Sequence, residues 1–248
     1  MSFFKNLKKP YLIAEIGVNH ECSISKAKKM IRFAKLGGAD AVKFQTYKAS
    51  LLASKNSPAY WDRKKEKTIS QYKLFSKYDK FENKDYKILQ KYCKKEKIDF
   101  VSTPFDDQAV YNLKNIVPFF KIASADINNF PLLKSIGKTK KPVLISTGAS
   151  SIKEIKQAIK TLKKYGSTNF AIMHCILNYP TKDSDANLNM IKDLKKKFPK
   201  ISIGYSDHTF PDSNMSSLTL ACIFGAVILE KHFTLNKKLK GNDHYHSM

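Results

Sequence analysis

Residues able to carry out acid–base, metal or anion chemistry recur at the ends of short apolar stretches along this chain. Each stretch has the length and β-rich composition of a buried strand. These residues are Glu15, Lys43, Gln45, Thr103, Lys121, Ser124, Ser146, His174, Ser206, His208 and His232. In a barrel of parallel strands, the C-terminal strand ends and the loops after them meet at one mouth. The pattern therefore predicts an active site ringed by parallel strands.

Eight such stretches alternate with amphipathic segments, and eight strands close this kind of barrel. The predicted strands are 11–17, 41–46, 100–105, 119–124, 142–148, 170–175, 201–208 and 226–232. Helical spacing of apolar residues predicts helices at 25–36, 83–96, 152–164 and 188–198. Ser151 and Glu154 have the spacing of a capping box, which predicts a helix start. The predicted fold class is α/β, a (β/α)8 TIM barrel, with residues 1–248 forming a single domain.

Two segments depart from the regular alternation. The connection between Thr46 and Asn83 is much longer than an ordinary strand-to-helix loop. It contains the stretches 60–62 and 70–72, and a long insertion at a barrel mouth is expected to shape the substrate pocket. After the eighth strand only residues 233–248 follow, which are too few for a closing helix and its cap. We therefore expect the final helix to be truncated.

The formal net charge is +24, from 45 Lys and Arg against 21 Asp and Glu. Such a charge can serve nucleic-acid binding or attract an anionic substrate. Most of the basic residues are lysines in helical stretches, not the arginines that bind phosphates and bases in a bidentate way. No RNP, helix-turn-helix or zinc-finger pattern accompanies them, so we expect no nucleic-acid partner.

The composition also bears on location and redox state. No apolar run approaches the roughly 20 residues of a membrane span, and the N-terminus lacks the apolar core of a signal peptide. We expect a cytoplasmic protein without a membrane partner. The four cysteines form no C-x-x-C pair, so reduced thiols are expected, with neither a disulfide framework nor a thiolate zinc site.

Two histidines end neighbouring strands and are candidate metal ligands. His208 and His232 can converge on one ion, which neutral imidazole suits. Glu15 and Asp243 can complete the coordination or transfer protons. The alternative for each of these residues is an ordinary hydrogen bond at a strand end or loop.

The lysines and hydroxyls of the strand ends are candidate anion ligands. Lys43 and Lys121 supply positive charge for a phosphate and a carboxylate. Four hydroxyls supply directional hydrogen bonds, from Thr103, Ser124, Ser146 and Ser206. A strand-end serine can instead cap the next helix, which fits Ser151 better than Ser146. Tyr179, in the loop after the sixth strand, can reach the mouth.

A series of short motifs runs along the chain. The motifs are AEIGVNH (14–20), VKFQT (42–46), STPF (102–105), KIAS (121–124), STG (146–148), YPT (179–181), SDHT (206–209), EKHFT (230–234) and GNDH (241–244). In this order they resemble those of the sialic acid synthase family, which comprises N-acetylneuraminate, legionaminate and pseudaminate synthases. The resemblance covers nearly the whole chain.

The resemblance implies a metal-dependent condensation of phosphoenolpyruvate with an open-chain N-acetylated amino sugar, either N-acetylmannosamine or a diacetamido-dideoxy hexose. The products are a nine-carbon 2-keto sugar acid and phosphate. It implies that His208 and His232 bind a divalent metal, manganese or alternatively magnesium. The implied phosphoenolpyruvate contacts are Lys43, Thr103, Lys121, Ser124, Ser146 and Ser206. The resemblance also implies contacts to the sugar or to the metal's water, from Glu15, Gln45, Tyr179 and Asp243. Of these, Glu15 and Asp243 are the implied catalytic residues.

The chain also departs from the family pattern. Leu177 replaces a commonly polar residue near one phosphoenolpyruvate contact, and Asp126 stands where glutamate is frequent. The resemblance implies a homodimer, in which a small antifreeze-like domain supplies an arginine to the partner's sugar site, but residues 1–248 contain no such domain. Two alternatives remain open: a Schiff-base aldolase using Lys121 or Lys231 as the amine, and a non-catalytic truncated remnant that binds phosphoenolpyruvate without turnover.

Overall fold

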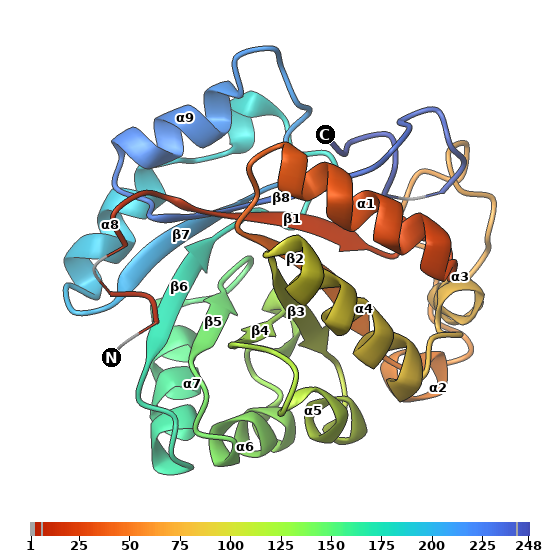
Figure 1. Cartoon of the computed structure of the whole chain (residues 1–248). Coiled ribbons are helices and arrows are strands. Elements are labelled where there is room, and N and C mark those ends of the chain that lie inside the picture. The colour runs from red at the N-terminus through yellow and green to blue at the C-terminus, as the bar shows by residue number, and fades with distance from the viewer. Residues whose placement is uncertain (1–2, 6, 242) are drawn as a thin grey trace.

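Eight parallel strands form one sheet that curves into a nearly closed barrel (Figure 1). The computed structural model describes residues 3–5, 7–241 and 243–248, so Asn242 of the last motif lies outside the described residues. The sheet order is β3-β2-β1-β8-β7-β6-β5-β4, and the end strands β3 and β4 lie beside each other. The strands are β1 (Tyr11–Gly17), β2 (Ala41–Thr46), β3 (Asp99–Pro104), β4 (Phe120–Ile122), β5 (Val143–Ser146), β6 (Phe170–His174), β7 (Ser202–Asp207) and β8 (Ile228–His232). The predicted α/β barrel is confirmed.

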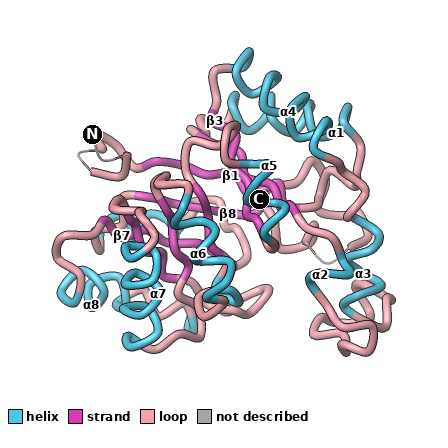
Figure 2. The backbone as a smooth tube through the Cα atoms, turned by 90° about the horizontal axis from the view of Figure 1, so that it is seen from below, coloured by secondary structure: helices cyan, strands magenta, loops and turns pink. Residues whose placement is uncertain are grey.

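Helices surround the strands on the outside (Figure 2). The four predicted helices are present as α1 (Ile24–Leu36), α4 (Asn83–Glu96), α7 (Ile152–Lys164) and α8 (Asn189–Lys197). The predicted capping box at Ser151 and Glu154 is confirmed at the start of α7. The structure adds α2 (Ala49–Leu52), α3 (Gln71–Tyr78), α5 (Asp107–Leu113), α6 (Phe130–Lys138), α9 (Ser216–Ile223) and the 3-10 turns η1 (Ser124–Asp126) and η2 (Asp183–Asp185).

Alternation along the strands divides the barrel into an outer and an inner core. Side chains of one parity pack outward against the helices, as Phe44, Ile145 and Ile172 do. Side chains of the other parity face the barrel interior, and those near the N-terminal strand ends form a separate apolar cluster. Phe4 closes this inner cluster, with its ring centroid 5.1 Å from that of Phe119. The bottom of the barrel is therefore filled by apolar side chains.

The inner face becomes polar toward the C-terminal strand ends. The apolar residues Ile13, Val101, Leu144 and Ile228 are each followed, two positions later, by Glu15, Thr103, Ser146 and Glu230. Because residues two apart on a strand face the same way, these polar side chains lie directly above the apolar layer. These polar side chains of the barrel interior therefore lie at its C-terminal end.

Some strand boundaries differ from the prediction. β4 contains only Phe120–Ile122, and Ser124 begins the 3-10 turn η1 instead of ending a strand. β7 ends at Asp207, so His208 is the first residue beyond it. After β8, residues 233–241 and 243–248 form turns and no helix. Among the residues that the structure describes, no helix has both the length and the apolar character needed to cross a bilayer.

Candidate active site

The structure brings all the predicted site residues together. They line one cavity of about 560 Å³ at the C-terminal end of the barrel. Its walls include Glu15, Lys43, Gln45, Thr103, Lys121, Ser124, Ser146, Tyr179, Ser206, His208, His232 and Asp243. These residues come from seven strand ends and two loops, which is the convergence expected of a parallel barrel.

Strand register places the site residues at similar heights. Glu15 on β1 is opposite Lys43 on β2 and opposite His232 on β8. Gln45 is opposite Thr103 on β3. The side chains of such neighbours lie within reach of one another, so the floor of the cavity is a continuous polar layer.

Two buried lysines and two buried glutamates form this floor. Lys43 Nζ lies 2.7 Å from Glu15 Oε2 and 3.8 Å from Glu230 Oε1, and Lys121 Nζ lies 3.3 Å from the same Glu230 oxygen. All four side chains are at most 5% exposed. Their charges therefore interact in a medium that screens them far less than water does.

Burial and neighbouring charge shift the pKa values of this cluster. Burial disfavours the Glu230 carboxylate, but Lys121 and Lys43 outweigh it and lower the Glu230 pKa to about 2. Burial also disfavours the Lys43 ammonium, but Glu15 and Glu230 raise its pKa above 10.5. For Lys121 burial prevails and lowers the pKa, despite Glu230. The carboxylates of the floor thus oppose the effect of burial on both lysines, and they outweigh it at Lys43.

The hydroxyls are fixed around this cluster by hydrogen bonds. Thr103 Oγ1 accepts from Lys43 Nζ at 3.4 Å, and Ser206 Oγ donates to Glu230 Oε1 at 2.8 Å. Ser124 Oγ accepts from the Gly148 amide at 2.9 Å. These three hydroxyls therefore have defined positions before any ligand enters.

Gly148 allows the close packing at this wall. A Cβ at this position would lie 2.8 Å from Leu177 Cδ2 and 3.0 Å from Ser124 Oγ. Both distances are shorter than ordinary van der Waals contacts, so a larger residue would displace the Ser124 hydroxyl. Leu177, the departure noted in the sequence, forms part of the cavity wall.

Both ring nitrogens of His208 have polar neighbours. Its Nδ1 lies 2.6 Å from the Ile176 carbonyl oxygen and therefore carries the proton. Its Nε2 is then the acceptor nitrogen of the ring and lies 3.4 Å from Ser206 Oγ. Burial, and then the neighbouring His232, lower the His208 pKa to about 3, so the ring is neutral near pH 7. The ring centroids of His208 and His232 are 5.5 Å apart, and the Tyr179 ring lies 4.1 Å from His208.

His232 is paired with Asp243 and adjoins a third histidine. His232 Nδ1 lies 3.5 Å from Asp243 Oδ2. Burial opposes the charge of His232, but Asp243 outweighs it and raises the His232 pKa, while the same pairing lowers the pKa of Asp243. The His246 ring centroid is 5.0 Å from that of His232.

The residues present fit a divalent cation. Imidazole nitrogens and carboxylate oxygens suit manganese, and magnesium accepts carboxylates. Among the described residues, His232 Nδ1 is buried and has no hydrogen-bond partner. Its contact with Asp243 Oδ2, at 3.5 Å, is longer than a normal hydrogen bond. A buried nitrogen in this situation can bind a cation, so the donor set is consistent with the predicted metal at His208 and His232.

Two other residues from the sequence analysis, His174 and Lys231, have their partners outside the cavity. His174 Nε2 lies 2.8 Å from the Ala186 carbonyl oxygen, and its ring stacks on Tyr205. Lys231 lies on the outward face of β8, with its Nζ 2.6 Å from Asp207 Oδ2. Neither residue lines the cavity.

The long insertion contributes to the pocket as predicted. Tyr60 and Gln71, from the two polar–aromatic stretches, line the cavity, together with Phe75 and Tyr78 of α3. Sequence reasoning did not select Glu230 or His246. Glu230 shares a face with His232 on β8, and that alternation was the signal for it. His246 lies in a segment of turns, where no periodicity marks its direction.

Comparisons with known proteins identify relatives of this chain. The chain is 39% identical to an N,N'-diacetyllegionaminic acid synthase of Campylobacter jejuni, over 98% of this chain and 72% of the relative. It is 38% identical to an N-acetylneuraminate-9-phosphate synthase of Drosophila melanogaster, over 94% of this chain and 62% of the relative. The chain therefore spans only 62–72% of the length of these two relatives.

A solved structure has the same fold. The crystal structure of an N-acetylneuraminic acid synthetase from Leptospira borgpetersenii, in complex with citrate, superposes with a TM-score of 0.85 and 35% identity. The match covers 97% of this chain and 79% of that chain. The sequence model of the NeuB family matches residues 30–248. Motifs, barrel and relatives agree, and the chain belongs to the NeuB family.

Proposed function

We propose that this chain condenses phosphoenolpyruvate with an open-chain N-acetylated amino sugar, giving a nine-carbon sialic-acid-type 2-keto acid and phosphate. One observation carries the proposal. The cavity floor has two buried lysines with hydroxyls around them, while the imidazoles of His208 and His232 also line the cavity. This arrangement suits a small anion held deep in the barrel and a polar second substrate above it. The named synthases among the relatives support the same reaction class.

The buried lysines account for anion binding. Lys43 and Lys121 can offer their charges to the phosphate and the carboxylate of phosphoenolpyruvate, while Ser124, Ser146 and Ser206 supply hydrogen bonds. Glu230 lies within 3.8 Å of both ammonium groups. Its carboxylate favours the charged form of both lysines and so opposes the effect of burial, which disfavours that form.

The reaction forms one carbon–carbon bond and releases one phosphate. The methylene carbon of phosphoenolpyruvate attacks the sugar aldehyde, whose oxygen takes a proton and becomes a hydroxyl. Water adds to the resulting cationic carbon, and phosphate then leaves with its bridging oxygen. Glu15 and Asp243 line the cavity and are the groups placed to transfer these protons. The lysines stabilise the phosphate as its charge increases.

A divalent cation completes the proposed site. His208 and His232 would hold manganese, or alternatively magnesium, and the cation supplies Lewis-acid polarisation of the sugar aldehyde. The long insertion, through Tyr60 and Gln71, borders the part of the cavity where the sugar would lie.

The direct test is phosphate release from phosphoenolpyruvate by the purified chain with manganese. N-acetylmannosamine and diacetamido-dideoxy hexoses are supplied separately, and His208→Ala and Lys43→Met serve as comparison variants. Release that depends on the sugar and disappears in both variants is the expected result. A folded, metal-loaded chain that releases no phosphate with any of these sugars would refute the proposal in favour of a non-catalytic remnant.

A Schiff-base aldolase is the second candidate, because Lys121 lies in the cavity with a lowered pKa. Lys231, the other candidate amine, is paired with Asp207 outside the cavity. Borohydride treatment with pyruvate distinguishes the mechanisms. A covalent adduct on Lys121 would support the aldolase, whereas an unmodified chain is expected for the condensation proposed here.

A further inference from the structure

The segment after β8 brings a third histidine to the barrel mouth. The backbone amide of Met248 donates to the His232 carbonyl oxygen at 2.8 Å, and the Thr234 amide donates to the Met248 carbonyl oxygen at 3.0 Å. Asn19 Nδ2 donates to Ser247 Oγ at 3.2 Å. These bonds fix residues 243–248 against β8, so the position of His246 is set by backbone contacts.

His246 is buried but makes no hydrogen bond among the residues described. It is 1% exposed, and both of its ring nitrogens lack a partner, as does Nδ1 of the neighbouring His232. Buried polar atoms are almost always satisfied, and an unsatisfied one requires an explanation such as an ion. Both nitrogens of His246 are thus unsatisfied, and His232 Nδ1 has only the longer contact with Asp243 Oδ2 at 3.5 Å. Such a pair of adjacent imidazoles indicates a missing ligand.

The donor atoms are close enough to share a cation. One atom each from His232, Asp243 and His246 lies within 4.8 Å of the others. Ligand–metal distances of about 2.0–2.3 Å place two ligands of one ion up to roughly 4.5 Å apart. Small side-chain adjustments would thus close the group around an ion. Two nitrogens and one oxygen suit a borderline cation such as manganese.

We propose that His246 is a further ligand of the cation that the proposed function assigns to His208 and His232, with Asp243 completing the donor set. This inference deepens the proposed function, because His232 also belongs to the pair with His208. The Tyr179 ring, 4.1 Å from His208 and 5.7 Å from His246, packs against both histidines.

The test measures manganese binding without substrates. His246→Phe keeps an aromatic ring, slightly larger than imidazole, against Tyr179 and His232 and removes both ring nitrogens. It is expected to weaken manganese binding by at least about tenfold in calorimetric titration. Electron spin-echo spectroscopy of bound manganese should show one coordinated imidazole fewer than in the unmodified chain. His174→Phe, which also removes a buried imidazole, is expected to leave both readouts unchanged.

Three outcomes decide the matter. A weaker affinity and a lost imidazole signal in His246→Phe, with an apo-protein unfolding temperature that does not fall, support the inference. Unchanged binding in His246→Phe alongside lost binding in His208→Ala overturns it and leaves the proposed function intact. Absence of manganese binding by the unmodified chain overturns both the inference and the metal dependence, while phosphate release still tests the reaction. If His246→Phe fails to fold, His246→Gln is measured in the same way.

Discussion

At the scale of single residues, Glu230 links the two lysines of the cavity floor. Its Oε1 atom lies within 3.8 Å of Lys43 and Lys121 and accepts from Ser206. A buried ion cluster contributes little net stability as a whole, but loss of one member leaves the others uncompensated. The same carboxylate thus serves stability and the charge state of the site.

The first prediction concerns the loss of this carboxylate. Glu230→Gln is expected to lower the free energy of unfolding by about 3–5 kcal/mol, because two buried ammonium groups lose a counter-ion. Urea denaturation at pH 7 measures the change. Glu154→Gln at the exposed start of α7 is the matched control, since glutamine also completes a capping box. Added phosphate should recover more stability in Glu230→Gln than in the unmodified chain, and equal recovery would contradict anion binding by the lysines.

The second prediction follows from the lowered pKa of Glu230. Lysine neighbours reduce it from 4.5 to about 2, so the folded state binds this proton less readily than the unfolded state. The stabilisation is therefore complete above pH 4.5 and is lost as the pH falls toward 2. Urea denaturation at several pH values measures the free energy of unfolding. As the pH falls from roughly 5 to 3, this free energy should decrease less steeply for Glu230→Gln than for the unmodified chain. Parallel pH dependences would show that Glu230 is not paired in this way.

At the scale of elements, an ion pair outside the barrel connects β7 to β8. Lys231 Nζ lies 2.6 Å from Asp207 Oδ2 and 2.9 Å from the Thr209 carbonyl oxygen. Asp207 Oδ1 accepts from the Thr209 amide at 2.9 Å. His208 lies between these two residues in sequence and faces the other way. The outward pair therefore fixes the backbone that carries an inward imidazole.

The third prediction concerns this connection. Lys231→Met should lower the free energy of unfolding by about 3–5 kcal/mol and weaken manganese binding, because Asp207 is left buried and unpaired and His208 loses its support. Urea denaturation and metal titration measure the two effects. The double variant Lys231→Met with Asp207→Asn should be more stable than Lys231→Met alone. A double variant that is less stable would mean that the pair does not act as a unit.

Two features of the sequence made much of this fold and site predictable: the alternation of side chains along each strand and the polar residues at the strand ends. Because inward and outward residues alternate, Lys43, Gln45 and the other strand-end residues could be placed on one face from sequence. Five helices were not predicted, although α6 has an Asn129 cap and a proline in its first turn. β4 has only three residues, too few for a pattern to define its end. His246 lies in a segment of turns. The direction of a side chain in such a segment depends on tertiary contacts, which a local sequence pattern does not show.

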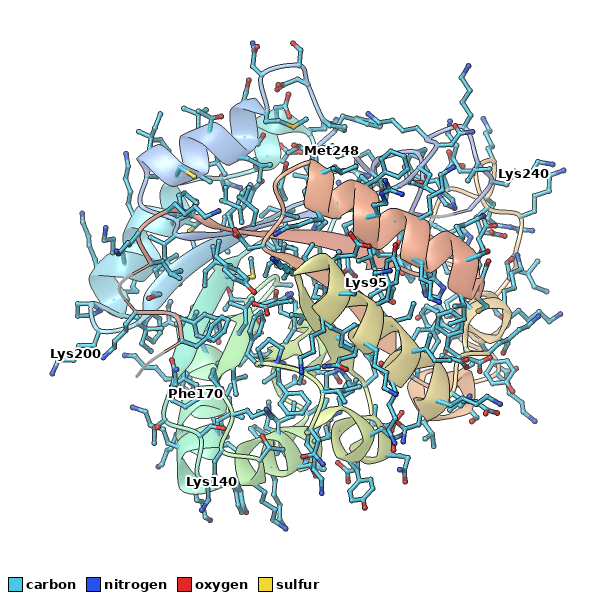
Figure 3. All side chains as sticks on the ribbon, in the orientation of Figure 1. Lys95, Lys140, Phe170, Lys200, Lys240 and Met248 are labelled. Atoms are coloured by element: carbon cyan, nitrogen blue, oxygen red, sulfur yellow. The ribbon has the colours of Figure 1, made fainter. Side chains whose placement is uncertain are left out.

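At the scale of the whole molecule, charge is distributed unevenly between surface and interior. Figure 3 shows Lys140, Lys200 and Lys240 at the outline of the molecule, pointing away from the barrel. The interior lysines that have ion-pair partners, Lys43, Lys121 and Lys231, are matched by buried carboxylates. The net charge of +24 therefore reflects mainly the surface. Its field extends into solvent, where salt screens it.

The fourth prediction separates these two kinds of charge. Raising salt from roughly 0.05 to 0.5 M shortens the Debye length from above 10 Å to below 5 Å. The association rate of phosphoenolpyruvate should fall several-fold, because the surface field that attracts an anion is screened. Stopped-flow binding measures this rate. The dissociation rate should change much less, since Lys43 and Lys121 bind the anion in a buried cavity. An association rate insensitive to salt would show that the surface lysines do not attract the substrate, whereas a dissociation rate that rises steeply would place the anion outside the barrel.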